Sequence, residues 1–364
     1  MINFELDQEQ KMLTDTISRF AKEQMRKVFR DADEDGKIPA NVVQAGWEIG
    51  LLPTSIPEAY GGFGEYSLFT NVVALEAFGW GDLAITVNIM VPNSIAIPVM
   101  LAGTEAQKEA HLPLFCEEAL PKVSAALTEP AIQYDPRNLR VTAVTEGNDH
   151  YILNGKKSVV PLANEAETFL VYANENGQTQ AFFISADTDG LTVGEREKLM
   201  GIRALPTFTL TLDNCRIPAE NRLGGEAGID FNLILNHSRV ALAAAAVGMV
   251  RGGHEYAIEY AKQRVQFGEP IAHYQSIAFL LAEMAIDVNA AEMMVWEAAW
   301  KLDRGEDATQ EVTIMKHFVD DMVVRVSDQA LQVLGGYGYI REYPVELWLR
   351  NARGFATFDG LILA

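Results

Sequence analysis

The sequence predicts an α+β protein of three domains: an N-terminal all-helical domain (residues 1–120), a middle antiparallel β domain (121–225) and a C-terminal four-helix bundle (226–364). Three observations predict this class. Apolar residues recur at helical spacing near both ends of the chain, and short β-prone runs separated by turn signals fill the middle. The length of 364 residues also exceeds what one ordinary hydrophobic core holds.

The first domain opens with a helix signal. Asp7 and Gln10 have the spacing of a capping box, which predicts a helix N-terminus there. Apolar residues then follow at helical spacing, namely Leu13, Ile17 and Phe20. The stretch 57–62 contains one proline and two glycines, so it predicts a loop before the helical pattern resumes.

Short β-prone runs define the middle domain. They lie at 139–144, 151–153, 169–172, 181–184 and 207–212. Asn-Gly or Asp-Gly pairs, at 154–155, 176–177 and 189–190, are expected to separate the strands. This spacing predicts an antiparallel sheet.

Two long apolar stripes define the last domain. The first consists of Ile277, Leu281, Met284, Val288, Ala291, Val295 and Ala298. The second consists of Val312, Met315, Val319, Met322, Val326, Ala330 and Val333. An alanine-rich helix after Arg239 precedes both, and amphipathic helices of this length pack as an up-and-down bundle.

Composition excludes several classes of partner. The net charge of -21 argues against binding to nucleic acid or to an anionic membrane surface, because both need clustered lysine and arginine. Cys116 and Cys215 are too few for a disulfide framework and too far apart for a metal motif. Residues 1–5 do not look like a signal peptide, and the apolar run 241–250 is too short to span a bilayer. We therefore expect a cytoplasmic protein.

No single motif identifies a catalytic site. The sequence contains no metal-binding motif, no Gly-Lys-Ser phosphate loop and no Gly-x-Ser-x-Gly elbow. Residues 335–338 are glycine-rich, but they follow a helical stripe rather than a strand. By themselves they predict a helix C-cap.

In combination, however, a series of ordered motifs resembles the acyl-CoA dehydrogenase family over nearly the whole chain. The motifs are Leu127-Thr128-Glu129-Pro130, Gly155-x-Lys157, Gly201-Ile202-Arg203, Arg264-Val265-Gln266-Phe267-Gly268, the segment 330–339, Glu342-Tyr343-Pro344 and Arg350-Asn351-Ala352-Arg353. The resemblance implies non-covalent FAD at a dimer interface and oxidation of an acyl-CoA thioester to its 2,3-enoyl form. It also implies electron transfer to an electron-transfer flavoprotein.

The resemblance also implies which residues bind FAD. Leu127 and Thr128, at the entrance to the β domain, are expected to bind the FAD of their own subunit. Two further groups are expected to reach the FAD of a neighbouring subunit. The first group is Arg264, Phe267 and Gln275, and the second is Gln332, Gly335 and Gly336. An arginine suits a pyrophosphate because its planar fork donates two hydrogen bonds. A solvated charge at a helix end is the alternative for Arg264.

For the substrate and the catalytic base, the resemblance implies four more residues. Tyr134, Arg239 and Met90 match positions near the acyl-CoA, although an ion pair explains Arg239 and core packing explains Met90 equally well. Asp359 matches the base, which in most members is a glutamate. A displacement of about 1 Å costs on the order of a hundredfold in rate, so the shorter carboxylate matters. The alternative for Asp359 is a surface turn before Gly360.

The flavin half of the site departs from the family pattern. Tyr134 replaces a serine, and Val159, Val160 and Pro161 stand where members carry a tryptophan, an isoleucine and a hydroxyl residue. Proline has neither a hydroxyl nor an N–H to donate. Losing such partners costs roughly 1–3 kcal/mol each unless they are replaced.

Three hypotheses follow. The first is a working dehydrogenase with Asp359 as base, in a homo-oligomer built as a dimer of dimers. The second is an FAD-deficient subunit that lends Arg264, Gln332 and Gly336 to a homologous partner in a hetero-oligomer. The third is a CoA-thioester binding protein without redox chemistry.

Overall fold

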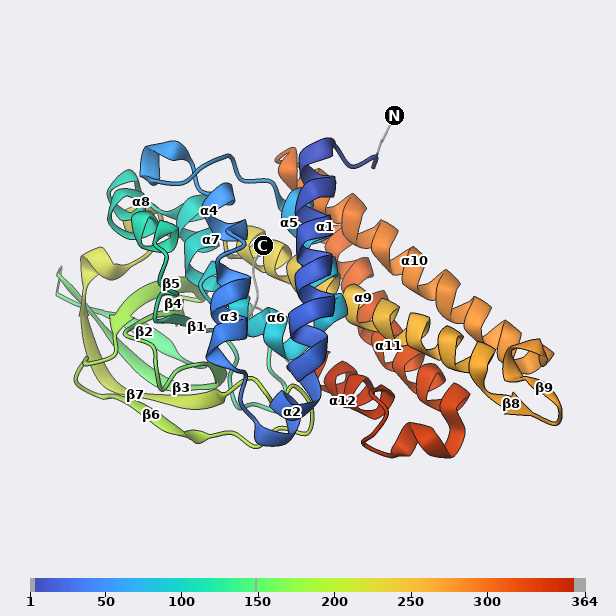
Figure 1. Cartoon of the computed structure of the whole chain (residues 1–364). Coiled ribbons are helices and arrows are strands. Elements are labelled where there is room, and N and C mark those ends of the chain that lie inside the picture. The colour runs from blue at the N-terminus through green and yellow to red at the C-terminus, as the bar shows by residue number, and fades with distance from the viewer. Residues whose placement is uncertain (1–3, 148, 357–364) are drawn as a thin grey trace.

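The computed structural model describes residues 4–147 and 149–356 and contains three regions in the predicted order (Figure 1). The N-terminal region is helical throughout. Its main helices are α1 (Gln8–Phe20), α2 (Arg26–Asp35), α3 (Ala40–Trp47), α4 (Leu51–Ser55), α5 (Leu68–Gly81), α6 (Leu83–Met90), α7 (Asn93–Ala102) and α8 (Glu105–His111). Asp7 and Gln10 form the predicted capping box. The α+β fold class is confirmed.

The middle region is a seven-stranded sheet. Its strands are β1 (Val123–Ala126), β2 (Thr142–Glu146), β3 (His150–Pro161), β4 (Thr168–Glu175), β5 (Gln178–Ser185), β6 (Leu191–Arg196) and β7 (Thr207–Pro218). The strand order is β1-β4-β2-β3-β7-β6, with β5 paired to β4. Most pairs are antiparallel, but β4 runs parallel to both β1 and β2, so the sheet is mixed rather than purely antiparallel.

One of the predicted turns is a tight turn in the structure, and another lies within a strand. Asn176 and Gly177 form the expected tight turn between β4 and β5, with φ of 52° and 87°. Asn154 and Gly155 do not separate strands; they lie inside β3, where the register shifts beside Gly155. Gly155 has φ of 138°, and a Cβ there would lie 2.8 Å from the Val141 side chain. The Asn-Gly pair therefore marks a β-bulge.

The C-terminal region is a bundle of α9 (Phe231–Gln263), α10 (Gln275–Asp303), α11 (Thr309–Leu334) and α12 (Val345–Phe355). The second predicted stripe is entirely buried in α11. The first is buried from Met284 onward in α10, while its first two members are half-buried. A small hairpin, β8 (Val265–Gln266) and β9 (Glu269–Pro270), projects at the far end of the bundle (Figure 1).

Helix α9 is the central helix of the fold. It is long and apolar enough to cross a membrane, but its apolar stretch is almost entirely buried, against α5, α10 and α11. Glycines allow α5 and α9 to touch: a Cβ at Gly79 would lie 2.0 Å from the Ala245 carbonyl oxygen, and one at Gly248 would lie 2.0 Å from that of Glu76. The N-terminal helices and the bundle consequently share one core.

Candidate functional site

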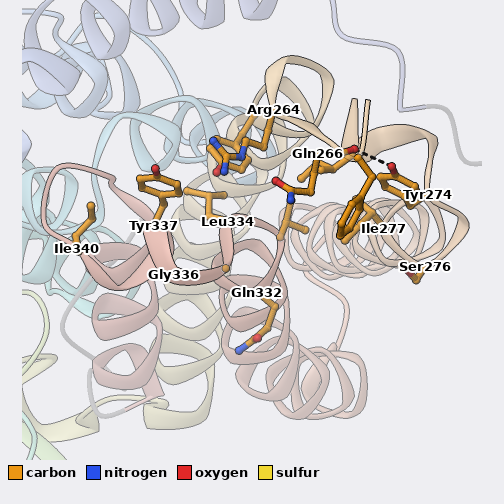
Figure 2. A pocket seen from close by; sticks show the side chains of 15 residues that line it. Arg264, Gln266, Tyr274, Ser276, Ile277, Gln332, Leu334, Gly336, Tyr337 and Ile340 are labelled. Carbon is orange, nitrogen blue, oxygen red and sulfur yellow. Dashed lines mark hydrogen bonds between the residues drawn. The ribbon is translucent and has the colours of Figure 1, made fainter. Parts of the chain in front are cut away.

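A groove of about 740 Å³ lies where α9 ends, the β8–β9 hairpin turns and α11 ends (Figure 2). Of the residues predicted to bind FAD in trans, it brings together Arg264, Phe267, Gln332, Gly335 and Gly336. These residues come from two segments far apart in the sequence. The fold therefore gathers five of the six predicted positions into one apolar, open concavity.

Helix α9 and the turn after α11 hold Arg264 in place. Its backbone N–H donates to the Tyr260 carbonyl at 2.8 Å, and its guanidinium stacks on the ring of Tyr337 at 5.3 Å. The Tyr274 hydroxyl donates to the Gln266 carbonyl at 2.7 Å and fixes the turn (Figure 2). Within residues 4–147 and 149–356, Arg264 has no carboxylate partner, so its charge is available to an anionic ligand.

The opposite wall of the groove is the end of α11. Gly335 caps this helix with φ of 59°, which confirms the predicted helix C-cap. A Cβ on Gly335 or Gly336 would meet nothing within 4 Å, so the backbone here faces open space. A ligand can therefore approach the main chain closely at this turn.

Two of the residues predicted to reach the FAD of a neighbouring subunit, Phe267 and Gln275, are exposed. Phe267 is 88% exposed at the tip of the hairpin with φ of 52°. Gln275 begins α10 and is also exposed, but it does not line the groove. An exposed phenylalanine beside an uncompensated arginine is an uncommon arrangement for a surface that stays in water.

The entrance to the β domain is built on a buried ion pair. Lys157 donates to the Glu129 carboxylate at 2.9 Å and to the Leu127 carbonyl at 2.8 Å. Glu129 also accepts from the backbone N–H groups of Arg140 and Val141, at 2.7 and 2.9 Å. Burial lowers the pKa of Lys157 to about 8. The Gly-x-Lys motif therefore fixes the conformation of residues 127–129.

The hydrogen bonds around Lys157 and Glu129 position the neighbouring Thr128. Its carbonyl accepts from the Ser158 N–H at 2.9 Å, whereas its buried hydroxyl has no hydrogen-bond partner in the part of the chain that the structure describes. A buried hydroxyl without a partner costs roughly 1–3 kcal/mol, so a polar ligand atom would stabilise it. The neighbouring Leu127 side chain is buried in the core instead.

Residues 159–162 follow directly; the resemblance implies that 159–161 lie beside the flavin, and we call the whole segment the flavin wall. Val159 and Leu162 have φ of 56° and 51°, a region that β-branched and bulky side chains rarely occupy. The Val159 N–H donates to both oxygens of Glu197 at 3.1 Å, and the Leu162 N–H donates to the Pro206 carbonyl at 2.9 Å. The backbone N–H groups of Val159 and Leu162 are therefore already hydrogen-bonded within the protein. Neither partner could be predicted from the sequence, because both lie in the connection between β6 and β7.

The remaining predicted residues are spread through the fold. Met90 is buried in the core on α6, Tyr134 is half-buried, and Arg239 is half-buried on α9. Asp359 lies outside the described residues. Across the described ranges no cluster of three or more His, Cys, Asp or Glu side chains is arranged to hold a metal ion.

Helices, a mixed sheet and a helical bundle follow one another in the order that the resemblance predicts, and family models confirm the family. The models for the acyl-CoA dehydrogenase N-terminal, middle and C-terminal domains match residues 7–119, 124–215 and 231–361. The chain therefore belongs to the acyl-CoA dehydrogenase family, whose members are FAD-dependent oxidoreductases.

Individual relatives match over almost their whole length. The chain is 35% identical to the probable acyl-CoA dehydrogenase YngJ of Bacillus subtilis (strain 168), covering 99% of this chain and 96% of that protein. It is 32% identical to the caffeyl-CoA reductase-Etf complex subunit CarC of Acetobacterium woodii, covering 97% and 95%. The solved butyryl-CoA dehydrogenase from Megasphaera elsdenii superposes with a TM-score of 0.90 at 30% identity, covering 99% of this chain and 96% of that one.

Proposed function

We propose that this protein is an FAD-dependent, cytoplasmic acyl-CoA dehydrogenase that oxidises an acyl-CoA thioester to the 2,3-enoyl-CoA. The observation that carries the proposal is the groove that joins Arg264 to the open Gly335-Gly336 turn. A cation without a carboxylate partner beside accessible backbone fits the pyrophosphate of a dinucleotide. The unpaired Thr128 hydroxyl fits a polar edge of the same cofactor.

Each of these groups would have a distinct role. Arg264, Phe267, Gln332 and the two glycines would hold the cofactor of a neighbouring subunit, and Thr128 would hydrogen-bond to the cofactor of its own subunit. Bound FAD supplies the two-electron oxidant for the acyl chain. Asp359 would accept the α-proton of the thioester.

We further propose an electron-transfer flavoprotein as the electron acceptor. The support is the relative CarC, which is named as a subunit of a reductase-Etf complex. A site whose cofactor contacts come from two subunits also needs an oligomer, so we propose a homo-oligomer built as a dimer of dimers.

A second candidate is an FAD-deficient subunit of a hetero-oligomer, and one observation favours it. Val159 and Pro161 leave the wall without an aromatic ring, and the Val159 N–H is already bonded to Glu197. The trans groove, in contrast, is intact. Such a chain would complete the site of a homologous partner without holding FAD itself. A CoA-thioester binder without flavin is the third candidate.

Flavin absorbance per protomer, followed by anaerobic addition of acyl-CoAs, separates these candidates. The proposal expects one flavin per protomer and bleaching by a thioester, which Asp359→Asn abolishes with flavin content retained. No flavin in the lone chain, but flavin gained on mixing with a homologue, would establish the second candidate. Thioester binding without flavin under either condition would establish the third.

A further inference from the structure

The loop between β6 and β7, residues 197–206, holds the flavin wall at two points. Its first residue, Glu197, accepts from the Val159 N–H at 3.1 Å and from the hydroxyls of Thr207 and Thr209 at 2.9 and 3.0 Å. Near its other end, the Pro206 carbonyl accepts from the Leu162 N–H at 2.9 Å. Both ends of the loop therefore support the unusual backbone of residues 159–162.

The middle of the same loop is bound to α12. The Ile202 N–H donates to the Asn351 side-chain oxygen at 2.6 Å, and both residues are buried. A Cβ on Gly201 would lie 2.0 Å from the Arg350 carbonyl oxygen, so only glycine permits this approach. Ile202 has φ of 54°, a strained value for a β-branched residue that the surrounding contacts must maintain.

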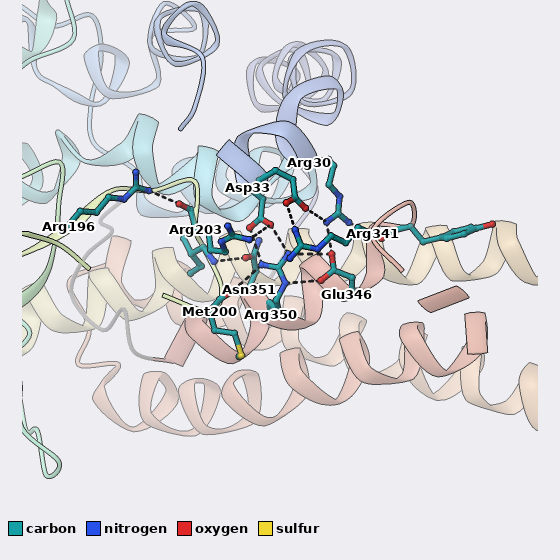
Figure 3. A network of polar contacts seen from close by, with 12 residues as sticks. Arg30, Asp33, Arg196, Met200, Arg203, Arg341, Glu346, Arg350 and Asn351 are labelled. Atoms are coloured by element: carbon teal, nitrogen blue, oxygen red, sulfur yellow. Dashed lines mark hydrogen bonds and ion pairs between the residues drawn. The ribbon is translucent and has the colours of Figure 1, made fainter. Parts of the chain in front are cut away.

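An ion-pair network anchors α12 in turn (Figure 3). Arg350 donates to both oxygens of the buried Asp33 on α2, at 3.1 and 2.7 Å, and to the Met200 carbonyl at 3.0 Å. Glu346 accepts from Arg350 at 2.8 Å and from Arg30 at 2.5 Å. Hydrogen bonds from these carboxylates raise the pKa of Arg350 despite its burial. The network therefore fixes α12 between α2 and the β6–β7 loop.

We propose that the β6–β7 loop is a positioning element that couples the flavin wall to α12. Asn351 and Gly201 set where α12 lies, and Glu197 and Pro206 set where residues 159–162 lie. A shift of α12 would therefore displace residues 159–162, which face the flavin in the proposed function. This catalytic consequence rests on the proposed function, whereas the mechanical coupling does not.

Hydrogen exchange measured by mass spectrometry tests the coupling. Asn351→Ala removes the acceptor for the Ile202 N–H, and the expected result is about tenfold faster exchange in peptides covering 157–163 as well as 197–206. Asn351→Asp keeps an acceptor oxygen, and because burial favours its neutral carboxyl form, it should restore part of the slow exchange at acidic pH. Asn221→Ala is the control, because the Asn221 side chain also makes one hydrogen bond to the backbone, donating to the Phe183 carbonyl at 3.0 Å, and Phe183 lies in neither segment.

Coupling is reciprocal, so a change at the flavin wall should also affect the middle of the loop. A variant at the wall can therefore test the proposal if Asn351→Ala does not fold. Glu197→Gln weakens the bond to Val159 and should speed exchange around Ile202. Unchanged exchange in 157–163 for Asn351→Ala, or an equal change in Asn221→Ala, would overturn the proposal. In flavin-loaded enzyme, Asn351→Ala should slow bleaching about tenfold with flavin retained. A wild type that lacks flavin would refute the proposed function and leave the exchange result interpretable.

Discussion

Two lysine–glutamate pairs in this protein have the same geometry and opposite surroundings. Lys157 and Glu129 are 2.9 Å apart and almost fully buried, whereas Lys122 and Glu167 are 2.9 Å apart and 64% and 72% exposed. Burial removes both charges of the first pair from water, so each depends on the other. The second pair remains hydrated and contributes little to stability.

We predict that Lys157→Met lowers the free energy of unfolding by about 3–5 kcal/mol, because it leaves the Glu129 carboxylate buried and uncompensated. Lys122→Met should cost less than about 1 kcal/mol. Denaturant unfolding of both variants measures the difference. The double variant Lys157→Met/Glu129→Gln should recover part of the loss, and a double variant as unstable as the sum of its parts would contradict the explanation.

At the scale of elements, the crossing of α5 and α9 depends on glycine. Gly248 permits backbone contact with Glu76, whereas Gly253, further along the same helix, has room for an added methyl group at 3.4 Å from Trp348. The two positions share a helix and differ in the neighbour that a side chain would meet. Alanine substitutions at the two positions therefore separate the effect of packing from the effect of helix propensity.

We expect Gly248→Ala to lower the free energy of unfolding by about 1–3 kcal/mol, because the new Cβ forces the two helices apart. Gly253→Ala should be neutral or stabilise by up to about 1 kcal/mol, since alanine favours helix. Thermal unfolding midpoints of the pair give the comparison. Equal midpoints for the two variants would show that the crossing tolerates separation.

The elements also show what the sequence could and could not predict. Long stripes in α10 and α11 were predictable because a helix that buries one face repeats its apolar residues over many turns. Strand β1 was missed because Val123–Ala126 is short and buried throughout, without alternation, and β6 because it is largely exposed and alternates only over its first four residues. In the site, resemblance found Arg264 and Thr128. Glu197 could not be found, because its role depends on strand pairing with β7 rather than on any local pattern.

At the scale of the whole molecule, the predicted FAD contacts fall into two separate places. Arg264 lines the groove at the end of the bundle, whereas Thr128 lies at the entrance to the β domain and does not line that groove. In the proposed function one cofactor touches Thr128 of one chain and Arg264 of its neighbour. The oligomer is then part of the site rather than an accessory to it.

Co-expression of Arg264→Gln and Asp359→Asn tests this arrangement. Each variant alone should be inactive as a homo-oligomer. Mixed dimers contain one site with an intact Asp359 from one chain and an intact Arg264 from the other, so random mixing should recover about a quarter of wild-type activity. No recovery from verified mixed oligomers would place Arg264 and Asp359 in the same site of one chain.

The Asp33–Arg350 ion pair has a consequence for how the protein is made. Asp33 leaves the ribosome 317 residues before Arg350 does. At about 5–20 residues per second, the carboxylate waits roughly 15–60 s for its partner. During that interval α2 cannot reach its final environment, and α12, the last described helix, is the segment that completes it. Helix α2 is therefore synthesised early, but it completes this ion pair only once α12 has been made.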